Sequence, residues 1–246
     1  MSELKTVLVT GSAGTIGRAV VSAFRDRYEL RCFDRVPTPS VADAVAGDLA
    51  DLEAVKSAMR GVDTVVHLAA TPDEADLLSQ LLPNNIIGAY NVFEAARQSG
   101  VQRVVAASTA QLAGLSQKVR FVRTDMAPGG TTIYAATKLF AEGLGRAYAH
   151  RYGLSVIMAR LGWCPRPGQD TRSISKSEVG QANYLSPGDV GRFFVCAVEA
   201  RGIRYEVFYV TSRPPGKPYL DIEPARRLLG YEPQDAWTGL HPNSSP

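Results

Sequence analysis

Apolar runs and amphipathic stretches alternate along most of this chain. The apolar runs are short, rich in Val, Ile and Ala, and lack the alternation of a half-buried strand, which predicts strands buried on both faces. We expect strands at residues 6–10, 28–34, 43–48, 63–70, 103–109 and 154–161. Helical apolar spacing predicts helices at residues 15–27, 51–60, 73–99 and 131–152, the third with a kink or restart at Pro83. Strands separated by helices favour a doubly wound α/β fold with a parallel sheet.

Three glycines follow the first expected strand at intervals of three residues, at Gly11, Gly14 and Gly17. A glycine-rich turn is the simplest interpretation, but these glycines lie between the first strand and the first helix. Without a Cβ the backbone turns tightly and can approach a pyrophosphate, and the helix N-terminus supplies unpaired N–H groups. The position therefore favours a dinucleotide site and a Rossmann-type sheet.

The next acidic residue at a strand end is Asp34, seventeen residues after Gly17. A carboxylate there accepts hydrogen bonds from the adenosine ribose hydroxyls and repels a 2′-phosphate. The adjacent Arg35 could instead hold that phosphate. We weigh Asp34 more heavily and predict NAD as the cofactor in preference to NADP.

The composition of the chain argues against several classes of function. The 27 Lys and Arg residues are scattered and the net charge is only +3, so no basic stripe marks a nucleic-acid surface. The chain starts without the apolar core of a signal peptide, and its longest apolar candidate, residues 192–200, has the length of a core helix rather than the ~20 residues that span a bilayer. Three separated cysteines favour reduced thiols in a cytoplasm, and three dispersed histidines predict no metal site. His67 ends an apolar run, which favours a histidine at the edge of the core.

Two long stretches, residues 110–130 and 162–188, show no clear periodicity. Both leave from the carboxyl end of an expected strand, where ligands bind in open α/β sheets, so they should flank the site. We expect residues 1–161 to form the dinucleotide-binding core. Residues 162–246 should supply a small substrate-binding region and complete the sheet, within one compact domain.

Tyr134 and Lys138 are four residues apart, so a helix places them on one face. Alone, the pair could be a surface tyrosine beside a surface lysine. Thr109 ends the fifth expected strand, twenty-five residues before Tyr134, and adds a hydroxyl at the carboxyl edge of the sheet.

The glycine spacing resembles that of the short-chain dehydrogenase/reductase superfamily, and further motifs match in order: "GDLAD" (47–51), "HLAA" (67–70) and "NNIIGAYNVFEAAR" (84–97). The last is similar to the helix signature of the extended, epimerase-like branch. The resemblance runs from Lys5 to about Tyr231. It implies a catalytic trio of Thr109, Tyr134 and Lys138, and a structural asparagine at Asn85.

The glycine loop and this resemblance together give an expected set of NAD-binding positions. These are Gly11, Ala13, Gly14, Thr15, Ile16, Gly17, Asp34, Arg35, Asp48, Leu49, Leu68, Ala69, Ala70, Asn85, Tyr134 and Lys138.

The implied trio suits hydride transfer. A hydride leaves a carbinol carbon only if a proton also leaves its oxygen, and a free tyrosine with a pKa near ~10 is too weakly ionised to accept it. A nearby ammonium and a nicotinamide cation favour the phenolate, so we expect Lys138 to lower the pKa of Tyr134. Thr109 would hold the substrate oxygen, and Lys138 would also bind the nicotinamide ribose.

Only about eighty-five residues follow the sixth expected strand, which is short for the nucleotide-binding region of nucleotide-sugar epimerases and dehydratases. Among compact extended members, the chain resembles the uronate dehydrogenases, which oxidise glucuronate or galacturonate at C1 to a lactone with NAD. The resemblance places a carboxylate-binding arginine at Arg172, which we expect to face the nicotinamide pocket, with Arg166 as a rival. The implied substrate-binding positions are Thr71, Ser108, Thr109, Ala110, Gln111, Tyr134, Trp163 and Arg172.

Several substrate positions differ from that family, and Thr71 and Pro72 stand where it has a serine. Ala110 and Gln111 replace its usual Asn-His, and Trp163 replaces a small polar residue. Two alternatives therefore stay open: an epimerase or dehydratase that uses bound NAD transiently, and a non-catalytic NAD-binding regulator. Dehydratases place acidic residues beside Thr109, and silent regulators lose the tyrosine or lysine, so both alternatives fit less well. The helix at 131–152 has apolar residues on more than one face, which favours a homodimer.

Overall fold

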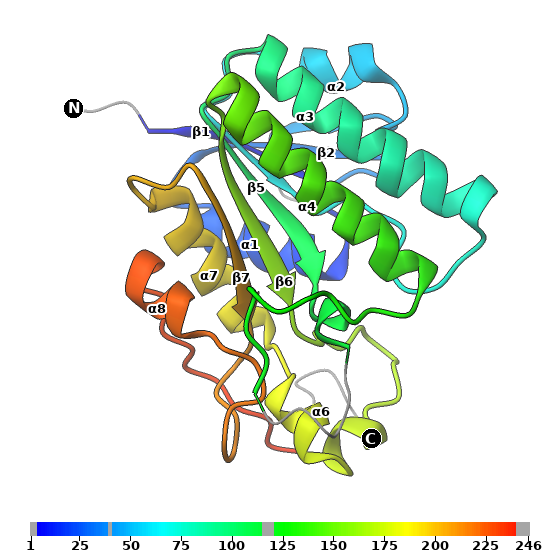
Figure 1. Ribbon diagram of the computed structural model, residues 1–246. Helices are drawn as coiled ribbons and strands as arrows, with labels where there is room; N and C mark the ends of the chain where they lie inside the picture. The colour runs from blue at the N-terminus through cyan, green and yellow to red at the C-terminus, as the bar shows by residue number, and fades with distance from the viewer. Residues whose placement is uncertain (1–3, 39–40, 115–120, 240–246) are drawn as a thin grey trace.

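The computed structural model describes residues 4–38, 41–114 and 121–239. A seven-stranded parallel sheet in the order β3-β2-β1-β4-β5-β6-β7 forms its centre (Figure 1). The strands are β1 (Thr6–Thr10), β2 (Glu29–Asp34), β3 (Asp43–Ala46), β4 (Thr64–His67), β5 (Arg103–Thr109), β6 (Ser155–Leu161) and β7 (Tyr205–Val210). The predicted α/β fold is confirmed, and β7 comes from the part of the chain in which no individual strand was predicted.

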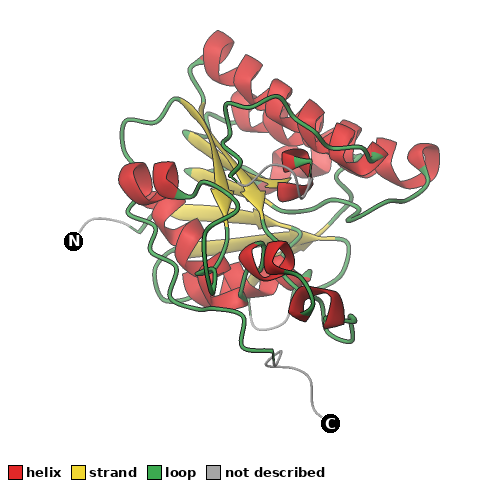
Figure 2. Ribbon diagram, turned by 60° about the horizontal axis from the view of Figure 1, so that its bottom comes forward, coloured by secondary structure: helices red, strands yellow, loops and turns green. Residues whose placement is uncertain are grey.

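Helices cover both faces of the sheet (Figures 1 and 2). One face carries α1 (Thr15–Phe24) and α7 (Pro187–Glu199), with α8 (Glu223–Leu229) beside them; the other carries α2 (Leu52–Ala58), α3 (Gly88–Gln98) and α4 (Ile133–Tyr152). Successive strand side chains point to opposite faces. Leu8 therefore packs in the cluster under α2 and α3, and Val9 in the cluster under α1 and α7.

The single helix predicted at 73–99 is wrong in its start and its geometry. Residues 73–76 form a loop, and the helix begins as an eleven-residue π-helix, η1 (Leu77–Ile87), with Asp76 as its N-cap. Pro83 lies inside this segment, and the N–H of Gly88 donates to the Pro83 carbonyl in the wide π pattern. The chain then continues as α3, so the expected restart occurs at Gly88 rather than at Pro83.

The two stretches without periodicity contain short helices. A 3₁₀ turn, η2 (Ala110–Ala113), directly follows β5. The stretch after β6 contains α5 (Arg172–Ser175) and α6 (Glu178–Ala182). All three lie at the carboxyl edge of the sheet, because they follow the ends of parallel strands.

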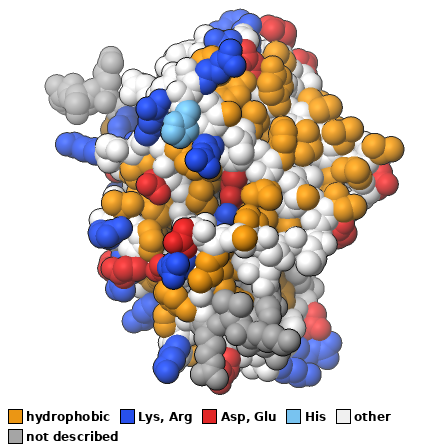
Figure 3. Space-filling model, viewed as in Figure 1, with side chains coloured by type: hydrophobic (Ala, Val, Ile, Leu, Met, Phe, Trp, Pro, Cys, Tyr) orange, Lys and Arg blue, Asp and Glu red, His pale blue; other side chains and the backbone are white. Residues whose placement is uncertain are grey.

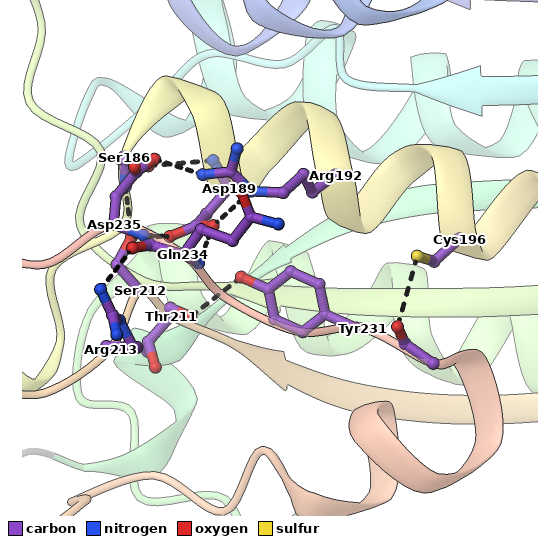
Figure 4. Close-up of polar contacts among 11 residues, drawn as sticks. Ser186, Asp189, Arg192, Cys196, Thr211, Ser212, Arg213, Tyr231, Gln234 and Asp235 are labelled. Carbon is purple, nitrogen blue, oxygen red and sulfur yellow. Dashed lines mark hydrogen bonds and ion pairs between the residues drawn. The ribbon is translucent and has the colours of Figure 1, made fainter.

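A buried carboxylate joins the last part of the chain to the sheet (Figure 4). Asp189 is fully buried in the first turn of α7, and it accepts hydrogen bonds from Arg192 Nε at 2.8 Å and Ser212 Oγ at 2.6 Å. It also accepts from the backbone N–H groups of Gln234 at 2.8 Å and Asp235 at 3.1 Å. Asp189 therefore fixes residues 234–235 against α7 and the loop that follows β7.

No helix in the described ranges is long and apolar enough to cross a membrane. Among those residues, no group of three His, Cys, Asp or Glu side chains could hold a metal ion. All three cysteines lie in the described part of the chain, where they form no disulfide.

Candidate active site

Two glycines of the glycine loop, Gly11 and Gly17, have no room for a side chain. Gly11 has a φ of 73°, and a Cβ added there would lie 2.5 Å from the backbone nitrogen of Ala69. A Cβ on Gly17 would lie only 2.1 Å from the Gly11 carbonyl oxygen. Gly14 is the N-cap of α1, so the first N–H groups of the helix open onto this loop. The geometry fits a cradle for a pyrophosphate.

Asp34 ends β2 beside this loop. Its carboxylate accepts hydrogen bonds from the N–H of Ala13 at 3.0 Å and, through its other oxygen, the N–H of Val36 at 3.3 Å. A carboxylate has about four acceptor positions, so capacity remains for ribose hydroxyls. Arg35 is exposed. The arrangement fits NAD, as the sequence predicts.

The remaining cofactor positions surround the same cradle. Thr15 and Ile16 form the first turn of α1, and residues 68–70 directly follow β4. Asp48 accepts a hydrogen bond from the N–H of Ala50 at 2.9 Å, and the carbonyl of the buried Leu49 accepts one from Asn91 Nδ2 at 2.8 Å. These contacts fix the segment after β3 against α3.

The structure brings Thr109, Tyr134 and Lys138 together. Thr109 ends β5, and its hydroxyl is hydrogen-bonded to the phenol of Tyr134 in the first turn of α4. Lys138 lies one turn further along, with Nζ 5.8 Å from the centre of the Tyr134 ring. This amine donates a hydrogen bond to the Ala107 carbonyl at 3.2 Å and is buried.

In the protein without NAD, Lys138 does not lower the pKa of Tyr134 as we expect from the sequence. Burial raises the pKa of Tyr134 to about 12, and only the hydrogen bond with Thr109 opposes it. Burial also lowers the pKa of Lys138 to about 8, because the charged amine is removed from water. A nicotinamide cation supplies further positive charge that favours the phenolate when NAD is bound.

His67 lies at the same edge and stays neutral. Burial, and then the charge of Lys138, lower its pKa to about 3. Its Nδ1 shares a hydrogen bond of 2.8 Å with the hydroxyl of Thr10 on the adjacent strand β1. The prediction of a partnered histidine at the edge of the core is confirmed.

Asn85 joins the loop after β4 to α4. Its side chain accepts from the N–H of Thr71 at 2.8 Å and donates to the Thr71 carbonyl at 3.1 Å. It also donates to the hydroxyl of Thr137 at 3.1 Å, between Tyr134 and Lys138 on α4. These bonds fit the structural role that the resemblance implies, and they place Thr71 beside the start of α4.

Ser108 is directed toward a buried ion pair. Its hydroxyl donates to Glu142 on α4 at 2.7 Å, and Arg160 on β6 donates to both oxygens of the same carboxylate at 2.8 Å. Arg160 also donates to the hydroxyl of Tyr209 on β7 at 3.1 Å. The structure therefore brings Ser108 together with this pair rather than with Tyr134.

Three other substrate positions contact the loops. Ala110 is buried in a small cluster with Val122 and Leu220. The Gln111 carboxamide accepts from the hydroxyl of Thr132 at 3.1 Å, at the N-cap of α4. Trp163 packs beside Ile174, Tyr184 and Trp237, and its Nε1 donates to Gln169 at 3.4 Å, so it acts in loop packing.

Arg172, which the sequence predicts to face the nicotinamide pocket, lies at the start of α5, and its contact with a substrate stays a prediction. Its side chain is 82% exposed and is paired with Asp170 two residues earlier, at 2.8 Å. Such a pair forms locally because the Asp170 carboxylate also accepts the backbone N–H of Arg172 at 2.9 Å. Its rival Arg166 instead pairs with Asp73, in the loop that follows β4.

The sequence interpretation missed two groups near the site. Glu74 accepts hydrogen bonds from the N–H groups of Ile133 and Tyr134, both at 3.3 Å, where α4 begins. Asn183 contains the one buried side-chain atom of the described residues that lacks a hydrogen-bond partner, its Oδ1. Its carbonyl accepts the N–H of Trp163 at 2.7 Å, which places it beside the end of β6. No motif marked either residue, because both contacts depend on the tertiary fold.

Comparison with known proteins gives a consistent result. Residues 7–175 match the sequence pattern of the NAD dependent epimerase/dehydratase family. An NAD-dependent glucose-6-phosphate dehydrogenase from Haloferax volcanii is 33% identical over 250 residues, covering 93% of this chain and 93% of that protein. An L-arabinose 1-dehydrogenase (NAD(P)(+)) from the same organism is 31% identical, covering 93% and 96%. A crystal structure of a uronate dehydrogenase mutant from Agrobacterium tumefaciens with NAD superimposes with a TM-score of 0.81 at 29% identity, covering 94% of this chain and 85% of the other.

Proposed function

Because this chain belongs to the NAD-dependent epimerase/dehydratase family, we propose that it is a dehydrogenase of free sugars that uses NAD. Its substrate is a sugar with an acidic group, a uronate or related sugar acid, oxidised at C1 to the lactone. The meeting of Thr109, Tyr134 and Lys138 at the carboxyl edge of the sheet carries this proposal.

Each residue of the trio has a distinct task. NAD held in the glycine cradle would supply the hydride acceptor for C1. The Tyr134 phenolate would accept the proton of the C1 hydroxyl, so that C1 becomes the lactone carbonyl carbon. The hydroxyl of Thr109 holds the substrate oxygen beside the Tyr134 oxygen with which it is hydrogen-bonded. Lys138 would hold the nicotinamide ribose, and its positive charge would favour the phenolate.

The names of the relatives support a sugar oxidised at C1. One is an L-arabinose 1-dehydrogenase, and the glucose-6-phosphate and uronate dehydrogenases act on sugars that carry an anionic group. A matched set of glucose, glucuronate and glucose 6-phosphate therefore distinguishes a neutral, a carboxylate and a phosphate substrate.

The test is NADH formation, followed by absorbance, with this set and a wider panel of uronates and aldoses. We expect one NADH per sugar and the highest kcat/KM on an acidic sugar. Isomerised sugar without net NADH would instead identify an epimerase. Tight NAD binding without turnover of any sugar would favour a non-catalytic regulator.

We further propose a homodimer through α3 and α4. Figure 3 shows hydrophobic side chains gathered on this face, and Tyr90, Leu139, Phe140 and Tyr152 are each 40–47% exposed. A second copy would remove this apolar surface from water. Phe140→Glu should convert the dimer to monomer in sedimentation experiments, whereas a monomeric wild-type protein would contradict the proposal.

A further inference from the structure

Two loops flank Asp34 at the carboxyl edge of the sheet, the glycine loop after β1 and the segment 35–38 after β2. The Asp34 carboxylate contacts both of them. One of its oxygens accepts the N–H of Ala13 at 3.0 Å, and the other accepts the N–H of Val36 at 3.3 Å. Asp34 therefore joins the two loops at the position where we expect the adenosine ribose of the cofactor.

A second contact joins the same two loops. The hydroxyls of Ser12 and Thr38 share a hydrogen bond of 2.6 Å, and both side chains are buried. The thiol of Cys32 on β2 is hydrogen-bonded to both hydroxyls. Burial raises the pKa of this thiol to about 11, so it stays protonated near neutral pH and can donate. The three groups therefore satisfy one another where solvent does not reach.

The segment 35–38 is short and stiff. Its backbone is fixed near one end by the N–H of Val36 and at the other end by the hydroxyl of Thr38. Pro37 lies between these two contacts, with a φ that its ring restricts, and it also restricts the preceding Val36. A displacement of Thr38 should therefore move the whole segment rather than be absorbed within it.

This segment carries a cation next to Asp34. The side chain of Arg35 is exposed, and its guanidinium suits a phosphate. Arg35 favours NADP where it reaches the 2′ position of the ribose, whereas Asp34 favours NAD. Which of the two prevails depends on the position of the segment 35–38 relative to the glycine loop.

We propose that the hydrogen bond between Ser12 and Thr38 is a positioning contact that sets the cofactor preference. It holds the segment 35–38 against the glycine loop, so that the space beside Asp34 accepts a ribose hydroxyl and excludes a 2′-phosphate. Without this bond the segment moves outward, which admits the phosphate and lets Arg35 pair with it. The inference concerns the cofactor site of a family that uses NAD, and it does not depend on which sugar is oxidised.

The test measures the dissociation constants of NAD and NADP by calorimetry in Thr38→Val and Ser12→Ala. Valine keeps the shape of threonine and removes its hydroxyl, so the ratio of the NADP constant to the NAD constant should fall at least about fivefold. Ser12→Ala should lower this ratio by a similar factor, because it removes the other partner. Since both changes remove the same bond, the double variant should lower the ratio no further than either single variant.

Two further variants are controls. Thr38→Ser keeps a hydroxyl, and its ratio should stay within about twofold of the wild type. Thr64→Val removes a buried hydroxyl at the start of β4, on the opposite edge of the sheet, and should leave the ratio unchanged.

The ratio of the two constants distinguishes this role from a purely structural one. If the bond only supported the fold, Thr38→Val and Ser12→Ala would lower Tm and weaken the binding of NAD and NADP by the same factor, which would overturn the inference. Equal binding of both cofactors by the wild type would overturn it too, since there would be no preference for this contact to set. Absence of binding of either cofactor would overturn the proposed NAD-dependent function as well.

Discussion

Replacement of Asp189 by alanine tests how the last part of the chain is held. This carboxylate is fully buried and accepts four hydrogen bonds, from Arg192, Ser212 and the N–H groups of Gln234 and Asp235. Asp189→Ala leaves three of these donors without an acceptor, whereas Arg192 keeps a second partner in Asp235 at 2.6 Å. Removal of one partner of a buried pair costs about 3–5 kcal/mol, and we expect a loss of unfolding free energy in that range.

Urea unfolding followed by circular dichroism measures this loss of unfolding free energy, and thermal unfolding measures the change in Tm. For a chain of this size, each kcal/mol lowers Tm by roughly 2–4 °C, so Tm should fall by roughly 6–20 °C. Asp189→Asn keeps the shape and one acceptor oxygen, and it should cost clearly less. A loss below about 1 kcal/mol for Asp189→Ala would refute the reasoning, because it would mean that these donors find other acceptors.

Three further predictions concern the cofactor and the proton. Gly17→Ala should abolish NAD binding in calorimetry, because the new Cβ would lie 2.1 Å from the Gly11 carbonyl oxygen; binding within threefold of wild type would contradict this. NAD should bind more tightly than NADP, and Asp34→Ala should reduce this difference in affinity. Equal affinities of the wild type for the two cofactors would indicate that Arg35, rather than Asp34, determines the cofactor preference. Since burial raises the pKa of Tyr134 to about 12, kcat/KM for oxidation should increase from pH 6 toward pH 9 as the phenolate fraction grows, and a decline over that range would contradict Tyr134 as the base.

The sequence predicts the fold and the cofactor cradle well because their signals are local. Apolar runs mark the six strands from β1 to β6, and glycines mark positions where the backbone leaves no room for a Cβ. The approach of Thr109 to Tyr134 follows from motif order combined with the α/β fold. Thr109 ends β5 and Tyr134 lies in the first turn of α4, so both residues lie at the carboxyl edge of the sheet.

The side-chain contacts of the loops on the substrate side could not be predicted, because they depend on loop conformation. Arg172 matched a family motif, and its side chain pairs with Asp170, two positions earlier on an exposed turn. The pair between Asp73 and Arg166 joins residues 93 positions apart, which no periodic pattern indicates. The π geometry of η1 was also missed, since Pro83 predicts a break in an α-helix but not a wider helix.

The turnover of Tyr134→Phe on an oxidised sugar tests the central claim most directly. The substitution removes one oxygen that the proton transfer requires, and it leaves Lys138 and the glycine cradle in place. We expect kcat to fall at least a hundredfold, since positioned acid–base groups contribute about 10²–10⁴-fold. The NAD dissociation constant and Tm should stay close to those of the wild type. A variant that kept more than about a tenth of the wild-type rate would contradict the assignment of Tyr134 as the proton acceptor.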